Sequence, residues 1–162
     1  MLDESQIKEE SGDWLHELAL NNSSLEVLNL YMTTLEMINI SDLQLIVTNC
    51  PSLTSLKVGD CDIMGMKGVL NKATALEEFG GGTFNISEDH LAEINISQMI
   101  KFPPNMTSLL GLNFKMENEM PAIFPRDFSL KRLDIQYTFF STENHCQLVG
   151  LYPNLEILEA RS

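Results

Sequence analysis

Leu25-Glu26-Val27-Leu28-Asn29-Leu30 is the stretch of sequence that decides the fold. It places apolar residues at its first, fourth and sixth positions, and a similar phrase returns five more times within the 162 residues. The first residues of successive copies lie 28, 23, 33, 21 and 25 residues apart. The six copies begin at Leu25, Leu53, Leu76, Leu109, Leu130 and Leu155.

A repeated phrase with a period of about 20 to 29 residues predicts a leucine-rich repeat solenoid. In each copy a short strand points alternate residues, such as Leu28 and Leu30, toward the neighbouring coil. One coil cannot bury these residues alone, so stacked coils share one core. We therefore expect an α/β fold of about six repeats over residues 1–162, a partial leucine-rich repeat domain. Parallel strands form its concave face and helices its convex face.

The segments between the copies carry helix and turn signals. Helical spacing of apolar residues predicts helices over 14–20, 41–50, 64–73, 87–100 and 142–151. Ser41 is expected to cap the second of these helices, and Pro51 prevents its continuation. The run Gly80-Gly81-Gly82 lacks the spacing of a phosphate-binding loop, so we expect a place where two backbones come close.

Charge and cysteine content exclude several classes of protein. A formal net charge of −13 argues against non-specific binding to nucleic acid or to an anionic membrane. No apolar run approaches the roughly 18 residues of a membrane span, and the N-terminus does not resemble an export signal. Cys50, Cys61 and Cys146 fit neither a disulfide framework nor a zinc site. We expect reduced, mostly buried thiols, no metal and no intrinsic cofactor.

Six Asn-x-Ser/Thr triplets favour a different class of protein, because such triplets accept N-linked glycans in secreted chains. They begin at Asn21, Asn22, Asn39, Asn85, Asn95 and Asn105. A secreted or receptor-type repeat domain is therefore the alternative to an intracellular one. Several triplets also have a structural explanation as helix caps or turns.

Catalysis is not expected, because the histidines are scattered along the sequence and the adjacent His145 and Cys146 point apart on a helix. The informative positions are the outward residues of the strands. Lys57, Lys115, Arg132 and Arg161 occupy such positions and are four of only ten basic residues. They predict either an anion-binding surface or ion pairs with acidic residues on neighbouring strands, such as Glu78, and the sequence favours neither.

Several longer phrases are more specific than the repeat itself. The chain resembles the coronatine-insensitive family of plant proteins, which are F-box leucine-rich repeat jasmonate receptors, with the auxin receptors as the nearest alternative. The phrases are Trp14-Leu15-His16-Glu17-Leu18-Ala19, Ser24-Leu25-Glu26-Val27-Leu28-Asn29, Tyr31-Met32-Thr33, Cys50-Pro51-Ser52-Leu53, Leu76-Glu77-Glu78-Phe79 before Gly81-Gly82, and Asn118-Glu119-Met120-Pro121.

The resemblance implies a substrate-recognition subunit of an SCF ubiquitin ligase in the nucleus. Such a protein holds jasmonoyl-isoleucine and an inositol phosphate and recruits JAZ repressors, while a Skp-type adaptor and a cullin complete the complex. The matching repeats are the middle ones, without the F-box, so we expect a fragment. Tyr137 and Arg161 match family positions that face the inner basic cavity, and the resemblance makes them ligand-binding candidates.

Overall fold

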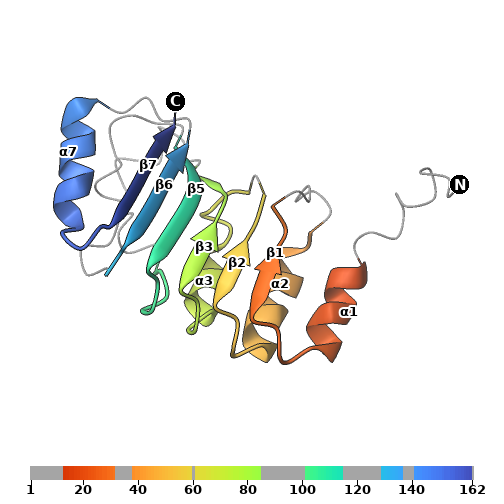
Figure 1. The fold of residues 1–162 in the computed structure, drawn as a ribbon. Coiled ribbons are helices and arrows are strands. Elements are labelled where there is room, and N and C mark those ends of the chain that lie inside the picture. Colours follow the sequence, from red (N-terminus) through yellow and green to blue (C-terminus); the bar gives the residue numbers. More distant parts are fainter. Residues whose placement is uncertain are drawn as a thin grey trace, which may run out of the picture.

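Helices and strands alternate along the parts of the chain that the computed structural model describes: residues 13–31, 38–59, 61–84, 101–114, 129–136 and 141–161. Figure 1 shows the strands side by side in chain order. The elements are α1 (Asp13–Asn21), β1 (Val27–Asn29), α2 (Ile40–Asn49), β2 (Ser55–Lys57), α3 (Lys67–Lys72), β3 (Glu78–Gly80), β4 (Thr83–Phe84), β5 (Ser108–Phe114), β6 (Arg132–Gln136), α7 (Thr142–Leu151) and β7 (Ile157–Arg161).

Every strand pair among the described residues is parallel. The main sheet runs β1-β2-β3-β5-β6-β7, and the short β4 pairs with β5 beyond the end of β3. Helices α1, α2 and α3 follow one another along one side of the sheet (Figure 1). The structure is a leucine-rich repeat solenoid and confirms the predicted fold class.

A single row of apolar side chains crosses the sheet beneath the strands. The strand register places one residue of each coil opposite its neighbour in the next coil. Leu133 is 0 % exposed, whereas Leu158, on the last described strand, is 41 % exposed. The row is therefore buried from β1 to β6 and is open at β7. Its members are Leu28, Leu56, Phe79, Leu109, Leu133 and Leu158.

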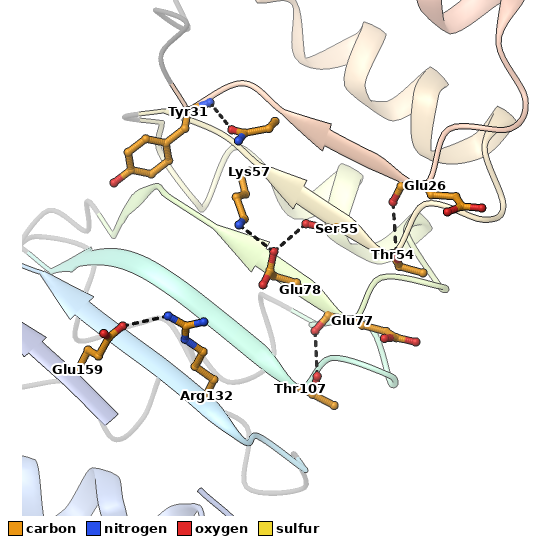
Figure 2. Close-up of polar contacts among 11 residues, drawn as sticks. Glu26, Tyr31, Thr54, Ser55, Lys57, Glu77, Glu78, Thr107, Arg132 and Glu159 are labelled. Atoms are coloured by element: carbon orange, nitrogen blue, oxygen red, sulfur yellow. Dashed lines mark hydrogen bonds and ion pairs between the residues drawn. The ribbon is translucent and has the colours of Figure 1, made fainter. Parts of the chain in front are cut away.

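A repeated backbone contact joins each coil to the next just before the strands begin. The Glu26 carbonyl oxygen accepts hydrogen bonds from the N–H groups of Thr54 and Ser55, at 2.9 and 3.2 Å. The same two-donor contact recurs at the carbonyls of Thr54, Glu77, Thr107 and Lys131. Side-chain hydroxyls add to it at Glu26 and Glu77, where Thr54 and Thr107 donate (Figure 2). We call this contact the carbonyl clamp.

The register corrects the predicted frame of the fourth copy. Phe79 pairs with Leu109, so Leu109 occupies the fourth position of its phrase rather than the first. Met106 takes the first position and is buried, because its flexible side chain fills the place of a leucine. The intervals around this copy become 30 and 24 residues, closer to those of the other copies. Strand β5 accordingly begins at Ser108.

The described helices agree with four of the five predicted from apolar spacing, and one predicted cap is wrong. Asn39, not Ser41, caps α2: its side-chain oxygen accepts a hydrogen bond from the Ser41 N–H at 3.0 Å. Ser41 instead donates its hydroxyl to the same oxygen at 2.7 Å. The helix predicted over 87–100 lies outside the described residues.

The triple glycine forms the close backbone approach predicted for it. Gly81 follows β3 with a φ of 84°, a left-handed conformation that glycine adopts readily. A Cβ at Gly81 would overlap the carbonyl oxygen of Val58. The Gly81 N–H donates to the Leu110 carbonyl at 2.7 Å, so this turn ties three coils together.

The cysteines only partly follow the expectation. All three are free thiols, with Cys50 buried, Cys61 partly buried and Cys146 exposed. The prediction of mostly buried thiols is wrong for Cys146, which lies on the solvent side of α7 while Leu148 points into the core.

Replacing Leu133 by Asp should unfold the domain, because the variant buries an unpaired carboxylate in the apolar row. We expect a loss of about 5 kcal/mol or more, which reaches the lower end of the typical total stability of about 5 to 15 kcal/mol. Leu158→Asp is the matched control in the same row, and its exposure should limit the loss to about 1 kcal/mol. Thermal unfolding followed by circular dichroism compares them, and equal losses would contradict the assigned row.

Gly81→Ala should lower the free energy of unfolding by about 2 kcal/mol or more, because the added methyl group meets a backbone carbonyl in a left-handed turn. Gly150→Ala is the control, since a Cβ there meets nothing within 4 Å and the residue lies in α7. We expect that change to be neutral or stabilising by up to about 1 kcal/mol. Urea unfolding of both variants tests the difference.

Candidate functional site

The outward side chains of the strands form the face of the sheet opposite α1, α2 and α3, which we call the open face. Neighbouring strands bring residues of opposite charge together on it, as Figure 2 shows for Lys57 and Glu78 and for Arg132 and Glu159. Its charged and polar residues include Asn29, Ser55, Lys57, Glu78, Ser108, Asn113, Arg132, Asp134, Gln136, Glu159 and Arg161.

Glu78 is the centre of the first charged group. Its Oε1 lies 3.0 Å from Lys57 Nζ and accepts a hydrogen bond from the Ser55 hydroxyl at 2.8 Å. Partial burial acts to raise the pKa of Glu78. Hydrogen bonds from Ser55 and Lys57 and the positive charges of Lys57 and Arg132 outweigh it and lower that pKa below its ordinary value. The carboxylate is therefore held in its charged form.

The second charged group joins β6 and β7. Arg132 donates to Glu159 at 3.2 Å. Arg161 lies 3.7 Å from Glu159 and 3.9 Å from Asp134, distances longer than a hydrogen bond. Two atoms of this group are buried without a hydrogen-bond partner, namely Arg132 Nε and Asp134 Oδ1. Such atoms are rare in proteins, because most buried polar atoms have a hydrogen-bond partner.

Three of the five predicted ligand-binding residues lie among the described residues, and two do not. Lys57, Arg132 and Arg161 lie on the open face. Each has an acidic neighbour on an adjoining strand, as the alternative of ion pairs between neighbouring strands predicted. Lys115 and Tyr137 lie outside the described residues. Binding of an anion or another ligand by these five residues stays a prediction.

A depression that the sequence did not reveal lies at the carboxyl ends of the strands and has a volume of about 290 Å³. Glycines form much of its surface: Gly59, Gly81, Gly82 and Gly111. Its side chains are neutral and polar, from Tyr31, Thr83, Asn113 and Gln136. Gly59 and Gly82, each directly after a strand phrase, were the signal in the sequence that could have pointed to this edge.

Among the described residues, no group of three or more histidine, cysteine or acidic side chains could hold a metal ion. Their helices also include none with the length and apolar character needed to cross a membrane. His16 contacts Asp42 at 2.8 Å and so links α1 to α2. This pair therefore joins two neighbouring repeats.

The solenoid with its charged open face defines the class, a leucine-rich repeat protein. The chain is 46 % identical over 161 residues to coronatine-insensitive protein homolog 1a of Oryza sativa subsp. indica, which covers 99 % of this chain and 26 % of that protein. It is 44 % identical over 162 residues to coronatine-insensitive protein 1 of Arabidopsis thaliana, covering 100 % of this chain and 27 % of the relative.

A more distant match is GRR1-like protein 1 of Arabidopsis thaliana, 28 % identical over 137 residues, which are 84 % of this chain and 23 % of the relative. No family model matches the chain. The comparisons confirm the resemblance to coronatine-insensitive proteins. The chain spans about a quarter of the length of these relatives.

Glu78→Gln should lower the free energy of unfolding at pH 7 by about 0.5 to 1 kcal/mol, because it removes the ion pair with Lys57 and keeps an acceptor for Ser55. A carboxylate whose folded-state pKa is lowered stabilises the protein above its ordinary pKa of 4.5. That contribution is lost as the pH falls through the lowered value. The difference from the parent should therefore shrink between pH 7 and pH 3.

Glu156→Gln is the control, because the Glu156–Lys131 pair, at 3.5 Å, is well exposed on both sides. We expect a loss of about 0.3 kcal/mol or less at either pH. Urea unfolding at the two pH values measures both variants. An equal loss for Glu78→Gln at pH 3 and pH 7 would show that charge is not the cause.

Proposed function

We propose that this chain is part of the recognition solenoid of a hormone receptor of the coronatine-insensitive type, and that it acts by binding rather than by catalysis. The observation that carries the proposal is 41 to 46 % identity to these proteins over at least 99 % of the chain. The match includes every strand that contributes to the open face. Identity at this level favours a shared solenoid geometry and a shared kind of ligand.

The whole receptor is proposed to be an F-box subunit of an SCF ubiquitin ligase that works in the nucleus. In it, jasmonoyl-isoleucine and an inositol phosphate would be held on the inner side of the solenoid while JAZ repressors dock for ubiquitination. This chain would supply a minority of those contacts, because it spans about a quarter of its relatives. A ligand pocket built over many repeats depends on the other coils as well.

Arg161 is the residue of the open face best suited to meet an anionic ligand. Its side chain is 61 % exposed, and its two acidic neighbours lie beyond hydrogen-bond distance. An arginine held loosely in this way can turn its guanidinium toward a carboxylate or phosphate at little cost. Arg132 is less free, because it donates a hydrogen bond to Glu159.

The proposal is tested by replacing the matching quarter of Arabidopsis coronatine-insensitive protein 1 with this chain. We expect the chimera to pull down a JAZ repressor in a jasmonoyl-isoleucine-dependent manner. The isolated 162-residue chain should give no measurable hormone binding by calorimetry. Each unmatched buried polar group costs about 1 to 3 kcal/mol, so losing several contacts lowers the affinity by many powers of ten.

Two further chimeras, each with one substitution, distinguish a loss of folding from a loss of ligand binding. Leu133→Asp within the transplanted part should abolish the pull-down by unfolding it, whereas Arg161→Gln should fold and bind hormone more weakly, by about tenfold. A correctly folded chimera that never recruits the repressor would refute the proposal. Stoichiometric hormone binding by the isolated chain would show that the site is complete within these repeats.

A further inference from the structure

The depression at the carboxyl ends of the strands is built around an irregularity in β5. Leu109 pairs with Leu133 and Leu112 with Ile135, so Leu110 and Gly111 together lie opposite the single residue Asp134. This is a β-bulge, a feature that locally disrupts the ladder and is frequent beside functional sites. Gly111 has a φ of 61°, which favours glycine there.

Two polar side chains from distant strands converge over Gly111. A Cβ at that position would lie 3.3 Å from the Tyr31 hydroxyl oxygen and 3.6 Å from Gln136 Nε2. Tyr31 follows β1 and Gln136 ends β6, at opposite sides of the sheet. Figure 2 shows the Tyr31 ring extending from β1 across the neighbouring strands. A side chain at Gly111 would therefore crowd the Tyr31 hydroxyl, and glycine keeps this part of the depression open.

The chemistry of the depression selects an uncharged ligand. Tyr31, Asn113 and Gln136 offer a phenol and two carboxamides, and among the described residues that line the depression none is charged. A charged group would lose part of its hydration there and would meet no charged side chain among the described lining residues. A purely apolar group would leave several donors and acceptors unpaired. A ligand group with both a donor and an acceptor satisfies the lining.

Asp134 orients the Gln136 side chain of the depression through a hydrogen bond. Its side chain is 10 % exposed, and its Oδ2 accepts a long hydrogen bond from Gln136 Nε2, at 3.5 Å. This contact uses one N–H of the Gln136 carboxamide, so the other N–H and the carbonyl oxygen stay available. Asp134 is thus a positioning residue.

We propose that the depression binds a carboxamide group of a partner protein, either an Asn or Gln side chain or an exposed peptide bond. The volume of about 290 Å³ is at the lower end of ligand cavities, which suits one side chain rather than a cofactor. That the ligand belongs to a protein rests on the proposed function. The preference for a carboxamide rests only on the lining of the depression.

Nuclear magnetic resonance of the isotope-labelled 162-residue chain tests the inference with small probes. Propionamide represents an Asn or Gln side chain and N-methylacetamide a peptide bond, and propionate and propylammonium are charged controls of similar size. At least one amide should shift the signals of Gly111, Asn113 and Gln136 in a saturable way, and the stronger of the two identifies the source. Both ions should bind at least tenfold more weakly.

Variants separate a binding role from a structural one. Tyr31→Phe and Gln136→Leu should each weaken amide binding about 3- to 10-fold, since each removes hydrogen bonds to the probe. Gln147→Leu, on the exposed side of α7, should leave it unchanged. No saturable shift with either amide, or tighter binding of an ion, would overturn the inference. Neither result depends on hormone or JAZ binding, so the proposed function fails or stands separately.

Discussion

The fold depends on one constraint, which is that the apolar row beneath the strands can be buried only by a neighbouring coil. Leu28, at one end, is 6 % exposed and Leu133 is fully buried, yet Leu158 at the other end remains largely open. Burial of such a side chain contributes about 1.5 to 3 kcal/mol. Stability is therefore shared between coils, as in other repeat proteins.

The inward side chains form the core, and the charged side chains of the open face take no part in it. Parallel strands lie about 4.8 Å apart, so outward side chains at matching positions are close enough to pair. Lys57 with Glu78 and Arg132 with Glu159 use that spacing. In an acidic chain, these pairs hold Lys57 and Arg132 in defined positions on the open face.

Much of the fold could be predicted from the leucine phrase, because its period and its alternation follow directly from the geometry of stacked strands. The frame of the fourth copy, that is, which residue takes its first position, could not be predicted in this way. Met106 replaces the leucine at the first position, and Leu109 and Leu112 on either side of the bulge allow two alignments of the same phrase. Only the pairing of Leu109 with Phe79 decides between them.

The charged part of the candidate site was also foreseeable, since strand alternation places Lys57 and Arg132 outward. The depression was not, because it depends on a φ angle at Gly111 and on Tyr31 reaching across from another coil. The cap of α2 shows the same limit. Asn39 and Ser41 both have capping side chains, and they are too close in sequence for the pattern of residues to decide which one caps the helix.

The carbonyl clamp has a consequence for how such a surface can evolve. Because the clamp is formed by backbone groups, its geometry does not prescribe the side chain that precedes each strand. The chain places glutamate, threonine and lysine there, at Glu26, Thr54, Glu77, Thr107 and Lys131. Mutation can thus change the charge along this edge of the solenoid, one coil at a time, while the coils keep their alignment. New binding preferences can arise there without a new fold.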